Sequence, residues 1–124
     1  MDELTSRITG VTGLDATVVE KAVGLILAFL AKEGPQEEIN KLLDSIPNAQ
    51  QVIAAAGDGA KGGGMMSMMG GGVMALGQKL MAAGVPMGQM QPLGRELFAY
   101  GREKAGEDTM GAIMGSIPGL GQFV

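Results

Sequence analysis

The chain repeats one hydrophobic pattern at a spacing of 71 residues. Laying residue n on residue n+71 aligns 13–53 with 84–124 without a gap, although only six of the 41 positions are identical. The match of apolar positions is the stronger signal, and both segments contain the triplet Ser-Ile-Pro, at 45–47 and 116–118. We therefore predict an internal duplication whose two copies pack on each other with approximate twofold symmetry, because neither buries its apolar stripe alone. The matched apolar pairs are Val19/Met90, Ala22/Leu93, Ile26/Leu97, Leu27/Phe98, Phe29/Tyr100, Ile39/Met110, Leu42/Ile113, Leu43/Met114, Ile46/Ile117, Val52/Phe123 and Ile53/Val124.

Within each copy the apolar residues recur at three- and four-residue steps, which is the spacing of one face of an α-helix. In the first copy, Asp15 is expected to cap a long helix that ends at Gly34. A second helix is expected to begin after Pro35 and to stop before Pro47. The second copy follows the same plan, but Pro92 and three Gly weaken its helices, so we expect it to be the less stable half.

Shorter segments accompany the two copies. Leu4 and Ile8 predict a short helix before Gly10, and a similar Leu-x-x-x-Leu segment begins at Leu76. Asn48–Ala56 can form one more short helix.

The segment between the copies is rich in Gly. From Gly57 to Gly72, eight of sixteen residues are Gly, and Gly at this density costs too much backbone entropy for a helix. The predicted fold class is therefore all-α: a compact helical bundle of two pseudo-repeated units, 1–56 and 73–124, joined by a flexible Gly/Met-rich connector, 57–72. At 124 residues the whole chain fits one compact domain.

Composition argues against several function classes. The chain has no Cys and no His, so thiolate nucleophiles, Cys-based zinc sites and the commonest general base are missing. The acidic pairs 37–38 and 107–108 begin helices, where the helix dipole accounts for them, and the charges at 96 and 102–104 indicate a solvated face. A net charge of -4 without a basic patch disfavours nucleic-acid binding. We expect a protein that is not an enzyme and needs no cofactor.

The sequence also bears on location. Met1–Leu4 is acidic and lacks the basic and apolar regions of a signal peptide. The longest uncharged apolar run, Ala22–Ala31, is ten residues long, whereas a membrane-spanning helix needs about 20. We expect a cytoplasmic protein without a transmembrane segment, with peripheral lipid contact left open.

The Met content is the most unusual feature of the composition. The chain has eleven Met but three Phe, one Tyr and no Trp, and Met65, Met66, Met68 and Met69 form a cluster. Met side chains adapt to varied apolar surfaces, so the cluster is a candidate contact for a second copy, another protein or a lipid surface. Two alternatives stay open: the four thioethers could bind a soft metal such as Cu(I) or a small apolar ligand, or they could cap the core. The predicted function is a binding or scaffolding protein.

Several short motifs together resemble a known group. They are Gly13–Ala16 before an Ala/Leu-rich helix, a closing Leu-Leu-x-x-Ile-Pro-x-Ala at 42–49, a Gly-rich middle, Phe98–Tyr100 before Gly106, and a final Ile-Pro-Gly. The combination resembles small bacterial helical proteins of the VcgC/VcgE family and, more distantly, paired-repeat domains of the same shape. The resemblance covers most of the chain and implies an all-helical fold and a bacterial cytoplasmic origin. It carries over no activity and no site residue.

Overall fold

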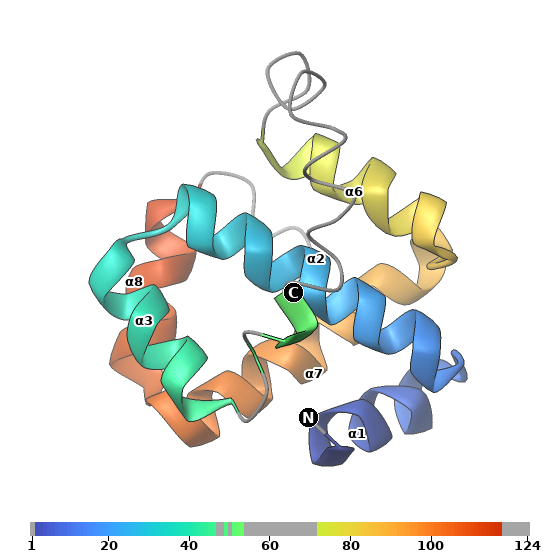
Figure 1. Ribbon diagram of the computed structural model, residues 1–124, viewed down its shortest axis with the longest axis horizontal. Coiled ribbons are helices and arrows are strands. Elements are labelled where there is room, and N and C mark those ends of the chain that lie inside the picture. Colours follow the sequence, from blue (N-terminus) through green and yellow to red (C-terminus); the bar gives the residue numbers. More distant parts are fainter. Residues whose placement is uncertain (1, 47–48, 50, 54–71, 118–124) are drawn as a thin grey trace.

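The computed structural model of the chain describes residues 2–46, 49, 51–53 and 72–117 (Figure 1). Helices account for nearly all of these residues and none of them lies in a strand, so the predicted all-α fold class is confirmed. The helices are α1 (Asp2–Thr12), α2 (Ala16–Glu33), α3 (Gln36–Ser45), α6 (Gly72–Ala83), α7 (Met87–Ala105) and α8 (Glu107–Ser116), and residues 49 and 51–53 are also helical.

Most predicted helix boundaries match, and three details differ. Asp15 precedes α2 with extended backbone, but its side chain makes no capping hydrogen bond. The prediction that the first helix ends before Gly10 is wrong, because α1 continues to Thr12. Gly72, which we assigned to the connector, is the first residue of α6. The remainder of the predicted connector, 57–71, lies outside the described residues.

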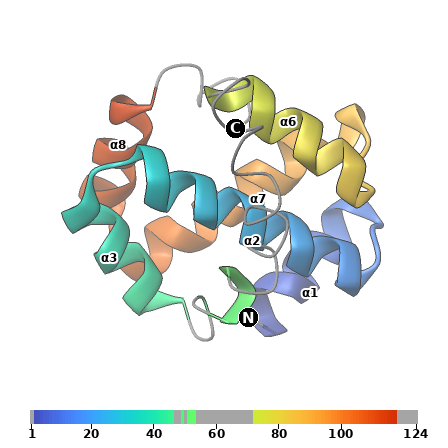
Figure 2. The same ribbon diagram turned by 45° about the horizontal axis from the view of Figure 1, so that its top comes forward.

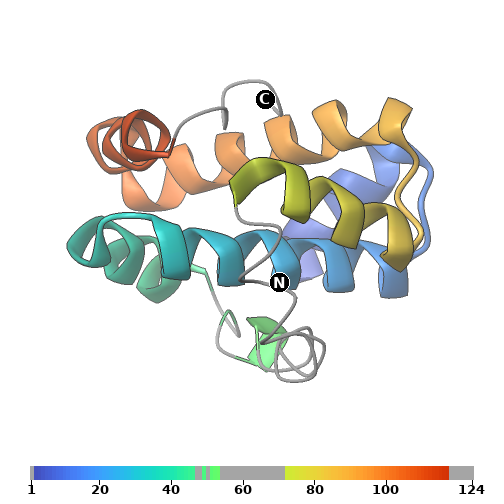
Figure 3. The same cartoon turned by 90° about the horizontal axis from the view of Figure 1, so that it is seen from above.

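The two long helices organise the molecule. Figure 3 shows α2 and α7 in separate layers, one over the other, and Figure 1 shows α1 and α6 on opposite sides of them. The helix α1 packs against α7 as well as against α2, and α6 packs against α2 as well as against α7. At the far end of the long helices, α3 packs against α8. Each short first helix therefore contacts the long helix of the other half.

Helices of the two halves begin at positions 71 residues apart. α2 begins at Ala16 and α7 at Met87, while α3 and α8 run over 36–45 and 107–116. The turns before the long helices also correspond, since Gly13 and Gly84 both have positive φ, +75° and +111°. The contacts of α1 with α7 and of α6 with α2 are equivalent under the same offset. Descent by duplication stays a prediction.

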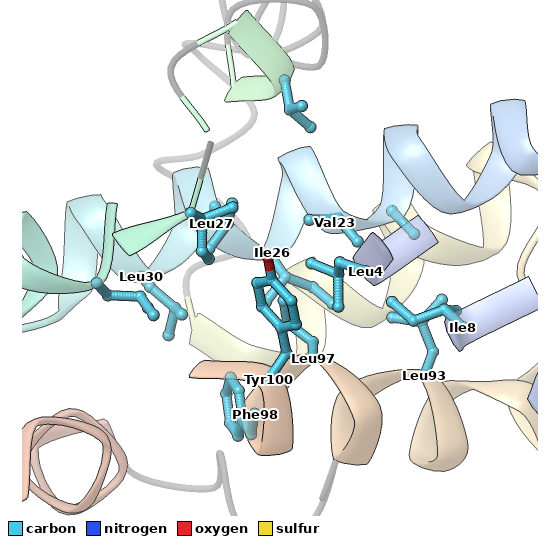
Figure 4. Packing of buried hydrophobic residues seen from close by; sticks show 14 of the residues in the cluster. Leu4, Ile8, Val23, Ile26, Leu27, Leu30, Leu93, Leu97, Phe98 and Tyr100 are labelled. Carbon is cyan, nitrogen blue, oxygen red and sulfur yellow. The ribbon is translucent and has the colours of Figure 1, made fainter. Parts of the chain in front are cut away.

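The matched apolar positions supply the core (Figure 4). Leu93 and Leu97 of α7 point toward Leu4 and Ile8 of α1 and toward Ile26 of α2. In every described pair but two, both members are buried: Leu43 and Met114 are both partly buried, and Phe29 is partly buried where Tyr100 is 2% exposed. The core therefore follows the repeat, with one asymmetry at Phe29 and Tyr100.

The helix α7 accommodates residues that usually weaken helices. It continues through Pro92, and Gly94 and Gly101 are buried within it. A Cβ at Gly101 would lie 2.8 Å from Sδ of Met110 and 3.1 Å from Cδ1 of Leu42. Gly101 thus permits the close approach of α8 and α3 to α7.

None of the described helices combines the length and the apolar character that crossing a lipid bilayer requires.

Candidate binding surface

Two tight turns lie at the same end of the molecule. The α1–α2 turn is closed by Gly13, whose N–H donates to the Thr9 carbonyl over 2.8 Å at a left-handed φ. The α6–α7 turn is closed at Val85, whose N–H donates to the Leu80 carbonyl over 2.9 Å. Figure 2 shows both turns on one side of the molecule. Backbone hydrogen bonds hold both turns, so the backbone that carries the neighbouring side chains has a fixed course.

Exposed apolar side chains gather at this end. Among the described residues, the large hydrophobic side chains that are exposed are Val11 (51%), Met81 (53%) and Met87 (73%). Val11 lies in the last turn of α1, Met81 in the last turn of α6, and Met87 begins α7. We call these three residues the apolar end.

Two observations place the turns next to each other. Val11 lines the same hollow as Pro92 of α7, so the end of α1 lies beside the start of α7. A Cβ at Gly84 would lie 3.5 Å from Val18, so the α6–α7 turn lies against the start of α2. The three residues of the apolar end therefore lie at the same end of the molecule, and both halves contribute to it.

A shallow, open hollow adjoins the apolar end. It has a volume of about 350 Å³ and is lined by Val11 of α1 and by Gln91, Pro92, Arg95 and Glu96 of α7. Met87 precedes Gln91 by one helical turn and so lies on the same side of α7. The hollow thus extends the apolar end with one cationic and one anionic side chain.

A cluster of charged side chains around Tyr100 joins α1 to α7 beside the hollow. The Nε of Arg7 lies 3.4 Å from Oε2 of Glu96, and its Nη2 lies 2.9 Å from Oε2 of Glu103. The Arg7 guanidinium carbon and the Lys104 Nζ lie 5.6 and 5.5 Å from the centroid of the Tyr100 ring. The hydrogen bond to Glu103 is the main cause that raises the pKa of Arg7, so its side chain stays protonated. We call these five residues the Arg7 cluster.

The Arg7 cluster revises the sequence interpretation of this face. Glu103 and Lys104 are exposed, as expected, but Glu96 and Glu103 are both paired with Arg7 of α1. Neither Arg7 nor Val11 belongs to a motif that we predicted to be functional. No local pattern could have identified them, because their partners belong to a helix about ninety residues further along the chain.

The predicted binding residues Met65, Met66, Met68 and Met69 lie outside the described residues. The acidic residues that we assigned to helix starts are in place: Glu37 and Glu38 lie in the first turn of α3, and Glu107 and Asp108 in that of α8. In the part of the chain that the structure describes, no group of three or more Asp or Glu is arranged to hold a metal ion.

Comparison with known proteins adds no relative. The chain matches no family model, no curated protein and no solved structure. The resemblance to the VcgC/VcgE family therefore stays an expectation that depends on the sequence motifs.

Proposed function

We propose that the chain is a small non-enzymatic binding protein that associates with a second copy of itself through the apolar end. The observation that carries this proposal is that the exposed large apolar side chains of the described residues gather at one end, and two of the three are Met. A single exposed apolar residue is ordinary, but a group beside a hollow is typical of a contact surface. The Met side chains can adapt their shape to an apolar partner.

A second copy suits this surface because a twofold dimer needs a patch that is complementary to itself. The hollow at the apolar end is lined by Arg95 and by Glu96, and Glu96 pairs with Arg7 through Oε2 while its side chain stays 27% exposed. A half-turn can bring the cation of one copy toward the anion of the other while the apolar residues meet at the centre. The predicted contact thus has an apolar centre and a charged rim, the usual composition of protein interfaces.

The proposal of a non-enzymatic role is supported by the residue inventory. The chain has neither Cys nor His, and its 13 carboxylates are the main groups left for proton transfer. Four of them occupy first turns of α3 and α8, where they stabilise the helix dipole. Glu96 and Glu103 are paired with Arg7, which leaves them a structural role between α1 and α7.

The test is the mass of the protein in solution, measured by analytical ultracentrifugation over a wide range of concentration. We expect a monomer–dimer equilibrium, and we expect the double variant Met81→Lys, Met87→Lys to weaken it by at least about tenfold in Kd, because four like charges would meet at the dimer centre. The control Asn40→Lys, Ala112→Lys adds the same charge at exposed positions of α3 and α8. It should dimerise like the wild type.

Two results would contradict self-association. One is a wild-type chain that stays monomeric at every concentration. The other is a dimer that the Met81 and Met87 substitutions leave intact, which would place the contact elsewhere.

The alternative of metal carriage depends on the thioethers of Met65, Met66, Met68 and Met69. Thioethers are soft ligands that suit Cu(I). A titration with Cu(I) against a competing chelator tests it, with all four residues changed to Leu as the control. Equal copper retention by the wild type and the Leu variant would exclude this site.

A further inference from the structure

Two of the three residues of the apolar end are Met residues whose thioether side chains are exposed to solvent. Met81 is 53% exposed and Met87 is 73% exposed, whereas Met90 is 6% exposed and Met110 is fully buried. Oxidation of Met by peroxide depends on access to the sulfur, and the product sulfoxide is polar. The apolar end thus combines accessible sulfur with a surface whose proposed role depends on being apolar.

The backbone around Met81 and Met87 favours oxidation without unfolding. The two residues flank the α6–α7 turn, in which Val85 is 1% exposed and its N–H donates to the Leu80 carbonyl. Val85 therefore anchors the turn in the core, while Met81 and Met87 stay on its outside. An oxygen added to either sulfur meets solvent and displaces no core side chain.

The buried Met residues differ in this respect. The Sδ of Met110 lies against Gly101, where even a Cβ would be only 2.8 Å away. Because Met110 is fully buried, peroxide reaches its sulfur only when the core opens. Selectivity between the exposed and the buried Met residues is therefore built into the fold.

We propose that Met81 and Met87 form an oxidation-sensitive switch, in which peroxide converts both thioethers to sulfoxides and thereby weakens dimerisation through the apolar end. The proposal depends on the proposed function. At each residue the sulfur lone pair attacks one peroxide oxygen, a sulfur–oxygen bond forms and the O–O bond breaks. The sulfur loses two electrons, the other oxygen leaves as hydroxide, and the proton of the transferred oxygen makes it water. Met sulfoxide reductases can reverse the change.

The site of oxidation can be read from one tryptic peptide. Cleavage after Lys79 and Arg95 releases residues 80–95, which contain Met81, Met87 and Met90. The native protein is diluted below its dimer Kd, so that the apolar end is uncovered, and treated briefly with hydrogen peroxide. We expect tandem mass spectrometry to find sulfoxide at Met81 and Met87 well before Met90. In guanidinium the three rates should become similar. Equal rates in the native protein would overturn the proposal.

The effect on dimerisation is measured on the same samples by ultracentrifugation. We expect oxidation to raise the dimer Kd at least tenfold, treatment with a Met sulfoxide reductase to restore it, and Met81→Gln, Met87→Gln to imitate it. The variant Met81→Leu, Met87→Leu keeps the surface apolar and retains every other Met. Its dimer Kd is measured before and after peroxide, and the two values should agree. A Leu variant whose Kd rises with peroxide would overturn the proposal.

The failures of the two proposals are distinguishable. If the Lys substitutions break the dimer but sulfoxides at Met81 and Met87 do not, the switch is wrong and the proposed function stands. If the wild type is monomeric before any peroxide is added, both are wrong, whatever the peptide map shows.

Discussion

At the scale of single residues, the paired positions Phe29 and Tyr100 show how the halves diverge. The Tyr100 ring is 2% exposed and flanked by Arg7 and Lys104, whereas Phe29 is only partly buried. At an offset of 71 residues, Arg7 and Lys104 correspond to Gln78 and Glu33, which cannot supply a cation over a ring. A guanidinium or ammonium group over an aromatic face is attractive, so Tyr100 has two favourable contacts that the residues at the corresponding positions cannot give Phe29.

The Arg7 cluster yields a prediction about salt. Arg7→Ala should lower the melting temperature at low ionic strength, and the loss should shrink as salt is added, because ion pairs at the surface are screened. Since its pKa is raised, the contribution of Arg7 is present below the ordinary pKa of Arg and is lost only as pH rises through the raised value. We therefore expect no titration of this effect near neutral pH. Lys41→Ala on α3 is the control. An equal salt dependence in both variants would show that the ion pairs of Arg7 do not contribute to the melting temperature.

A second residue-scale prediction concerns Gly13. A Cβ there would meet nothing within 4 Å, so the cost of a side chain is confined to the positive φ of +75°. Gly13→Ala should lower the free energy of unfolding by roughly 1–2 kcal/mol. Gly10→Ala, inside α1 and equally open, should raise it by about 0.5–1 kcal/mol. Chemical denaturation of both variants measures the two changes in unfolding free energy, which should have opposite signs. A stabilising Gly13→Ala would contradict the positive φ at this turn.

At the scale of helices, the sequence predicted the elements well and their contacts poorly. Gly34, Pro35 and Pro47 mark boundaries by local chemistry. The structure agrees, since α2 ends at Glu33 and α3 runs over Gln36–Ser45. The end of α1 was missed because Gly10 is tolerated inside a helix, and the Thr12 side chain, which donates to the Ile8 carbonyl over 2.7 Å, continues the last turn. The hollow and the Arg7 cluster depend on packing between α1 and α7, which local spacing does not encode.

Gly101 gives a prediction about the crossing of α7 with α8. Gly101→Ala should lower the free energy of unfolding by about 1–3 kcal/mol, because the new Cβ would lie 2.8 Å from Sδ of Met110 and 3.1 Å from Cδ1 of Leu42, and both side chains are buried in the core. Gly111→Ala on α8 has open space around its Cβ and should stabilise by about 0.5–1 kcal/mol. Thermal and urea unfolding test both. If Gly101→Ala is as stable as the wild type, the side chains of α3 and α8 around Gly101 can rearrange without cost.

At the scale of the whole molecule, the exchange of α1 and α6 makes each half depend on the other. Leu4 and Ile8 are fully buried, and the α1 that carries them packs against α7 of the other half. Cutting the chain between the halves therefore leaves large apolar faces open on both fragments. Cooperative folding requires both halves at once.

Fragments 1–56 and 72–124 test this dependence. We expect each fragment alone to show little helical circular dichroism and no cooperative unfolding, and an equimolar mixture to regain the helix content of the intact chain. Heat-denatured intact chain provides the reference for the unfolded signal. A fragment that unfolds cooperatively by itself would mean that its apolar stripe is satisfied within one half.

The placement of Tyr100 has a practical consequence. It is the single Tyr of a chain without Trp, and it lies between Arg7 of α1 and Lys104 of α7. Light absorbed by Tyr but not by Phe therefore excites one chromophore at one helix contact. Departure of α1 from α7 removes Arg7 from this ring, so the native protein carries an intrinsic optical probe at this contact and needs no added label.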